Sequence, residues 1–124
     1  MGYYQALPIY RAAMEAVTGV DAAVRDFPRY HKFAIGQRLR DASLEALVWV
    51  QRAHPRATRA RALPRLCAAA EELKLLVQAA KEVKAFASFR AYAQVMEQVV
   101  RLARQAEAWR AHESKRRPEP RRGA

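Results

Sequence analysis

Residues 88–109 have the sequence SFRAYAQVMEQVVRLARQAEAW, and this stretch decides the fold class. Its apolar side chains recur every three or four residues, which is the spacing of one face of an α-helix. The positions on that face are Phe89, Tyr92, Met96, Val99, Ala103 and Ala106. Ser88 is a good N-cap residue, because its hydroxyl can accept a hydrogen bond from a free N–H group of the first turn. The stretch therefore predicts an amphipathic helix over about 88–112.

The rest of the chain repeats this periodicity three times, and prolines mark the boundaries between the repeats. We expect the other helices over about 8–26, 33–53 and 63–85. Pro8 suits the first turn of the first helix, and Pro28 ends that helix, since the residue before a proline is pushed out of the helical region. The pair His54-Pro55 ends the second helix, and Pro64 is expected in the first turn of the third.

These four helices are similar in length and are joined by short connections, which favours antiparallel neighbours. The expected fold class is all-α, an up-down-up-down antiparallel four-helix bundle formed by residues 1–113. Gly19 and Gly36 fall inside the first two helices, where close approach of another helix is the expected reason for a glycine. Residues 114–124 contain two prolines and no large apolar side chain, so a disordered basic tail is expected there.

The apolar faces of the second and third helices are wider than a four-helix core requires. The positions off the main faces are Leu44, Leu47, Val48, Val50, Leu75 and Leu76. Apolar surface left over on a small bundle marks an interface, so self-association is expected. The alternative is that some of these leucines are exposed singly, which is normal for a folded protein.

Few residues of this chain are suited to catalysis or to metal binding. Cys67 is the single cysteine, so it can form neither an intrachain disulfide nor a cysteine-based zinc site, and its place on an apolar face predicts a core position. His31, His54 and His112 each lie at an expected helix end, and no Glu-x-x-His pair of the kind that holds metals in bundles occurs. We therefore expect a protein that is not an enzyme and that has no metal and no cofactor.

The sequence also indicates where in the cell the protein is expected. It has no run of about 18 apolar residues, and its first residues lack the basic and apolar regions of a signal peptide. A cytoplasmic protein without a membrane segment is the expectation.

The charge is strongly unbalanced, with 23 Lys and Arg against 12 Asp and Glu and a formal net charge of +11. No acid occurs between Glu45 and Glu71, and the arginines of that interval are Arg52, Arg56, Arg59, Arg61 and Arg65. From Glu113 onward, five cations stand against two acids. In an up-down bundle these two segments lie at the same end, so the sequence predicts one strongly basic pole.

A basic pole of this kind favours a polyanionic partner. The planar fork of arginine binds phosphate with two hydrogen bonds and stacks on unpaired bases, so RNA or single-stranded DNA is the expected ligand. The residues expected to bind nucleic acid are Arg52, Arg56, Arg59, Arg61, Arg65, Lys115, Arg116 and Arg117. The competing interpretation is that a GC-rich genome raises the arginine content and that these arginines only solvate helix faces.

Two of the expected helices resemble those of a known family. Residues 30–53 begin with the aromatic and basic segment YHKF and end in alanine, and residues 88–109 have a tyrosine near the start and a tryptophan near the end. They are similar to helices of the accessory variability determinant (Avd) proteins of diversity-generating retroelements. The related four-helix proteins encoded in ribosomal RNA intervening sequences belong to the same group. The similarity covers about residues 8–111.

The resemblance implies a basic, non-enzymatic accessory subunit that forms a homopentamer. It further implies binding to a reverse transcriptase and to template RNA or cDNA, in support of mutagenic reverse transcription. Secondary contacts to nucleic acid or polymerase are then expected at Arg38, Arg40, Lys74, Lys81 and Lys84. The alternatives are a helical adaptor for an acidic protein and a ribosome-associated four-helix protein of the intervening-sequence type.

Overall fold

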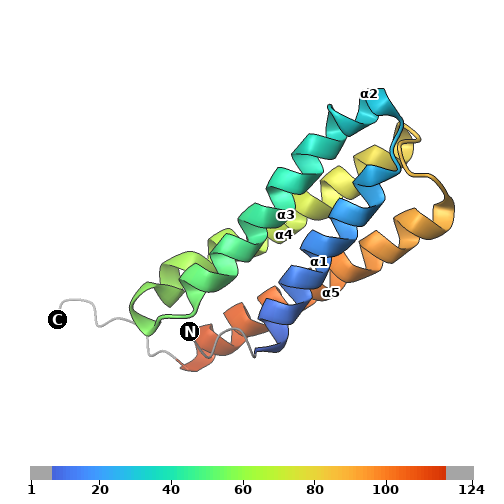
Figure 1. Cartoon of the computed structure of the whole chain (residues 1–124). Coiled ribbons are helices and arrows are strands. Elements are labelled where there is room, and N and C mark those ends of the chain that lie inside the picture. The colour runs from blue at the N-terminus through green and yellow to red at the C-terminus, as the bar shows by residue number, and fades with distance from the viewer. Residues whose placement is uncertain (1–6, 117–124) are drawn as a thin grey trace.

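The computed structural model describes residues 7–116, and within them every regular element is a helix and none is a strand (Figure 1). The expected all-helical class is therefore confirmed. The helices are α1 (Pro8–Arg25), the short α2 (Arg29–Lys32), α3 (Ile35–Ala53), α4 (Arg56–Glu82) and α5 (Phe89–Arg116). None of these described helices combines the length and the apolar character that crossing a bilayer requires.

The four long helices lie side by side and enclose one core (Figure 1). Contacts join α1 to α3, α3 to α4, α4 to α5 and α5 back to α1. Ion pairs follow the same neighbours, with Asp21 to Arg40 at 3.4 Å and Glu15 to Arg101 at 3.2 Å as examples. Cys67 is buried in this core, and burial raises the pKa of its thiol.

The start of α4 differs from the sequence prediction. The helix begins at Arg56 rather than near 63, so Pro64 lies inside it and not in its first turn. Contacts with the end of α3 and with the core stabilise these additional first turns of α4. The hydroxyl of Thr58 donates to the carbonyl of Arg52 at 2.7 Å, and Leu63 is almost fully buried in the core. These interactions offset the backbone hydrogen bond that a proline removes from a helix.

The end of α5 also differs from the prediction, because the helix continues to Arg116 instead of ending near His112. Residues 114–116, which were expected in a disordered tail, are therefore helical. The reason is visible at Glu113, which is 7% exposed and lies 3.8 Å from the guanidinium of Arg59 on α4. The rest of the expected tail, 117–124, lies outside the described residues.

The connection from α4 to α5 explains why α4 ends at Glu82 rather than at 85. Lys84 has a positive φ of 61°, and the N–H of Ala85 donates to the carbonyl of Ala80 at 2.9 Å. This six-residue closure is the usual way to end a helix, although glycine is the usual residue at the positive-φ position. The chain therefore places an exposed lysine where backbone geometry favours glycine.

The expected interface residues are divided between core and surface. Val50 is fully buried, whereas Leu47 and Leu76 are half-buried against the core. Leu44, Val48 and Leu75 remain exposed, by 49%, 40% and 69%. Three of the six positions thus leave apolar surface on the protomer, and self-association stays a prediction.

Both helix-interior glycines lie at close helix contacts, but the two contacts differ. A Cβ at Gly36 would lie 2.8 Å from Cγ1 of Val24 and 3.0 Å from the carbonyl oxygen of His31. At Gly19, the three atoms nearest to an added Cβ all belong to the amide end of the Gln98 side chain. The oxygen of that Gln98 amide is buried and has no hydrogen-bond partner among the described residues, so moving it breaks no hydrogen bond.

We therefore expect opposite effects from alanine at these two positions. Gly36→Ala lowers the free energy of unfolding by about 1–3 kcal/mol, because a branched side chain and the backbone must shift. Gly19→Ala raises it by about 0.5–1 kcal/mol, since alanine favours the helix and Gln98 can rotate away. Denaturant unfolding of both variants checks this, and equal effects would mean that the two glycines have equivalent surroundings.

Candidate nucleic-acid interface

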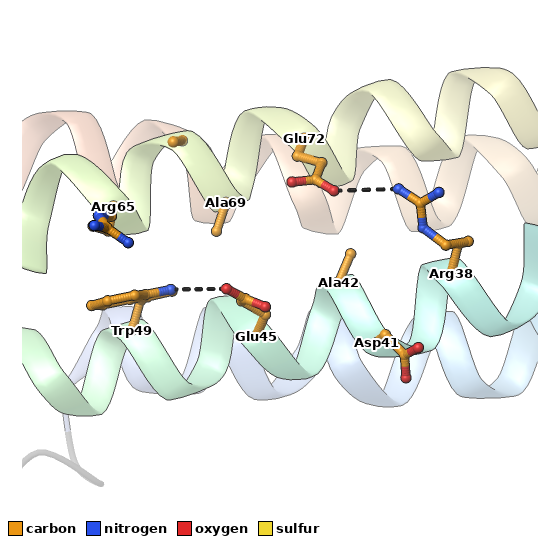
Figure 2. A pocket seen from close by; sticks show the side chains of 9 residues that line it. Arg38, Asp41, Ala42, Glu45, Trp49, Arg65, Ala69 and Glu72 are labelled. Carbon is orange, nitrogen blue, oxygen red and sulfur yellow. Dashed lines mark hydrogen bonds and ion pairs between the residues drawn. The ribbon is translucent and has the colours of Figure 1, made fainter.

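Trp49 on α3 is the centre of the candidate interface. Its half-buried ring lies 4.8 Å from the guanidinium of Arg52, one turn further along the same helix. The guanidinium of Arg65, on α4, lies 5.5 Å from the same ring. The indole Nε1 donates to a carboxylate oxygen of Glu45 at 3.2 Å, which fixes the ring between the two helices (Figure 2).

Two hollows border Trp49, and their charges differ. The hollow toward the α3–α4 connection has a volume of about 510 Å³, and its charged lining residues are Arg52 and Arg61. The groove on the other side has about 310 Å³ (Figure 2). It combines two arginines with three carboxylates, and these residues are Arg38, Arg65, Asp41, Glu45 and Glu72. An anionic ligand is therefore favoured in the first hollow and not in the second.

The cations at the start of α4 are available for such a ligand. Arg56 and Arg61 are exposed, and neither has an ion-pair partner within residues 7–116. Arg52 and Arg65 are also exposed, and their guanidinium groups lie over the Trp49 ring. An arginine stacked on an aromatic ring keeps its outer face and its N–H edges free for a base or a phosphate.

Arg59 belongs to the same sequence cluster but is held inside the protein. Its Nε donates to the carbonyl of Ala53 at 2.9 Å, and one terminal nitrogen donates to the carbonyl of His54. Its guanidinium also pairs with Glu113 and lies 5.6 Å from the ring of Trp109. Only 19% of the side chain is exposed, so this arginine joins three helix ends instead of facing solvent.

The end of α5 lies at the same end of the bundle, as the Arg59–Glu113 pair shows. Lys115 and Arg116, in its last turn, are exposed beside this contact, while Arg117 lies outside the described residues. We call this end the basic pole. Its exposed cations are Arg52, Arg56, Arg61, Arg65, Lys115 and Arg116.

The secondary residues do not form one surface. Three of them are ion-paired, with Arg38 to Glu72 at 3.5 Å, Arg40 to Asp21 at 3.4 Å and Lys74 to Glu71 at 3.2 Å. The other two, Lys81 and Lys84, lie near the end of α4, at the opposite end of the bundle (Figure 1).

Trp49 is not among the residues that the sequence predicts to bind nucleic acid, although it lies at the centre of the candidate interface. The available signal was the arginine three residues later, since residues at i and i+3 are neighbours on a helix. Sequence reasoning likewise grouped Arg59 with its neighbours. Its different role depends on Glu113 and Trp109, which are about fifty residues away in the sequence.

Within the described part of the chain, no three His, Cys, Asp or Glu side chains are grouped as metal ligands would be. Comparison with family models, with curated proteins and with solved structures gives no match to this chain. The resemblance to the accessory variability determinant family therefore stays a prediction.

Proposed function

We propose that the protein is a non-enzymatic accessory protein that binds single-stranded RNA or DNA at its basic pole. The observation that carries this proposal is the position of Arg52 and Arg65 over the Trp49 ring, beside a hollow whose charged lining residues are Arg52 and Arg61. Proteins that bind single strands combine a cationic groove for the backbone with aromatic or guanidinium planes for the bases.

The two parts of the pole have different roles in this proposal. Arg56, Arg61, Lys115 and Arg116 contact phosphates, because they are exposed and form no ion pair within residues 7–116. The Arg52–Trp49 stack receives an unpaired base, since every base has a π face that can lie on a guanidinium. Arg59 is not part of the binding set, because its donors already serve the protein.

The cellular role that we propose follows the resemblance: a cytoplasmic partner of a reverse transcriptase that binds its template RNA or cDNA. In this role the protein is an up-down-up-down bundle that assembles as a homopentamer. The exposed Leu44, Val48 and Leu75 support self-association, since they leave apolar surface on the protomer. Co-purification with a reverse transcriptase encoded beside the gene tests this part separately from nucleic-acid binding.

Nucleic-acid binding is tested by titrating the protein with a 20-nucleotide oligo(U) at salt concentrations from 50 to 400 mM. If about four to six cations contact phosphates, the logarithm of the affinity falls against the logarithm of salt with a slope of about −3 to −4. Tryptophan emission also falls, because a base stacks next to Trp49. An affinity that does not change with salt, as an adaptor for an acidic protein through apolar contacts would show, contradicts the proposal.

A further inference from the structure

We infer that the opposite end of the bundle is a second surface for single-stranded nucleic acid, so that one protomer holds two strands at once. This inference rests on the proposed class of ligand and adds a site and an activity to it. We call this end the aromatic pole. We define it by six of its exposed aromatic and cationic residues, Arg29, Tyr30, Phe33, Lys84, Phe89 and Arg90.

Three large aromatic side chains are exposed at this pole. Tyr30 is 77% exposed, Phe33 is 72% exposed and Phe89 is 69% exposed. A scattered exposed aromatic residue needs no explanation, but a group of them marks a binding surface. None of the three fills a gap in the core, which is closed at this end by Phe27 and Ala85.

Ring contacts run from the end of α1, next to the segment that carries Tyr30 and Phe33, to Phe89. Phe27, at the end of α1, packs edge-on against Phe86 in the α4–α5 connection, with ring centroids 5.2 Å apart. Phe86 contacts Tyr92 at 5.7 Å, and Tyr92 contacts Phe89 at 5.5 Å. These contacts connect the end of α1 to the start of α5, and α2 lies at the same end of the bundle (Figure 1).

Cations lie over these rings. Arg29 lies 6.0 Å from the ring of Phe33, and Lys81 lies 5.2 Å from Tyr92 and 5.9 Å from Phe89. Lys84 adds a further charge at the positive-φ position, where a glycine would relax the backbone. Lys84 is exposed, so its charge is available to a ligand at this pole.

The local balance of charge favours a polyanion. Five cations of this pole stand against two acids, and the seven residues are Arg29, Lys32, Lys81, Lys84, Arg90, Asp26 and Glu82. Glu82 already accepts a hydrogen bond from the amide of Gln78 at 3.1 Å. Backbone phosphates can pair with the excess cations, while bases stack on the exposed rings.

A membrane surface also attracts aromatic and basic residues, but the geometry favours nucleic acid. Insertion into a bilayer surface uses a broad apolar face on a long amphipathic helix. Here Tyr30 lies on a helix of four residues, and each exposed phenylalanine has a cation over its ring. The same pairing of cation and ring occurs at Trp49 on the basic pole.

The two poles are separated by the length of the bundle. The 19 residues of α3 span about 28 Å at 1.5 Å per residue. Two strands bound at opposite ends are held by one rigid body, and assembly of several protomers would multiply the sites. The expected activity is the bridging of two single strands.

The experiment measures how many molecules of a five-nucleotide oligo(dT) each protomer binds at 50 mM salt. Isothermal titration of the intact chain should give two molecules per protomer. Phe33→Ala/Phe89→Ala should reduce this number to one and leave the tryptophan quenching unchanged, because both tryptophans lie toward the basic pole. Arg56→Glu/Arg61→Glu should also reduce it to one, but with loss of the quenching. Circular dichroism confirms that each variant is folded.

Two further variants test the aromatic pole without removing an aromatic side chain. Lys81→Gln/Lys84→Gln should also leave one bound oligonucleotide, and Phe89→Trp should create an emission signal that the oligonucleotide quenches when the basic pole is disabled. One molecule per protomer in the wild type, lost only in Arg56→Glu/Arg61→Glu, would overturn the inference and leave the proposed function standing.

The same measurements give a different result if the proposed function itself is wrong. If Arg56→Glu/Arg61→Glu keeps both stoichiometry and quenching, the basic pole is not the binding site. Vesicles with 30% phosphatidylserine serve as the competing ligand. If they bind the wild type and not Phe33→Ala/Phe89→Ala, while oligonucleotide stoichiometry is the same for both proteins, the aromatic pole is a membrane surface and the inference is overturned.

Discussion

Replacing Arg59 with alanine is expected to lower the free energy of unfolding by about 3 kcal/mol. The change removes a largely buried guanidinium that joins α3, α4 and α5. It removes one ion-pair partner of Glu113, whose side chain is only 10% exposed, and a donor to the carbonyl of Ala53. Breaking a buried pair by removing one member costs more than the pair itself contributes, because a charge stays behind in the interior. Urea unfolding measures the effect.

The matched control is Arg56→Ala, three residues earlier on the same helix and fully on the surface. It should change stability by no more than about 0.5 kcal/mol. Adding Glu113→Gln to Arg59→Ala should recover part of the loss, since the remaining charge is then removed. If Arg59→Ala and Arg56→Ala have the same free energy of unfolding, the contacts of Arg59 do not stabilise the fold. Arg59 would then count among the residues that bind nucleic acid.

The helical class was predictable because the apolar spacing of each segment depends only on nearby residues. The helix ends were less predictable, since distant contacts decide them. Pro64 suggested a helix start, but Thr58 hydrogen-bonds back to the end of α3 and Leu63 packs into the core, so the helix begins earlier. His112 suggested a helix end, but the burial of Glu113 against Arg59 extends α5.

The candidate site was likewise predictable only in part. The acid-free interval that gives the basic pole its charge is visible in the sequence, and so are the arginines within it. Which arginine faces solvent is not visible there. Arg59 and Arg61 are two residues apart, and a helix turns them by about 200° relative to each other. One therefore meets Trp109 and Glu113, while the other lines the hollow beside Trp49.

Reversing the charges of Arg56 and Arg61 to glutamate is expected to weaken the binding of single-stranded RNA about 100-fold at 100 mM salt. Both side chains are exposed and face no acid within the described residues, so the change removes two phosphate contacts and adds two repelling charges. The salt dependence should become shallower, with the slope reduced by about 1.4 for the two lost contacts. Fluorescence titration over a salt series measures both quantities, and circular dichroism shows whether the helices are retained.

Net charge alone could cause some of this loss, and a matched pair of single variants separates the two effects. Arg61→Glu and Arg104→Glu change the net charge equally, and both side chains are exposed, but Arg104 lies on α5 and does not line the hollow beside Trp49. A contact at the basic pole predicts about a tenfold loss for Arg61→Glu and less than a threefold loss for Arg104→Glu. Equal losses would mean that the chain attracts nucleic acid through its overall charge, because a general field does not distinguish one exposed arginine from another.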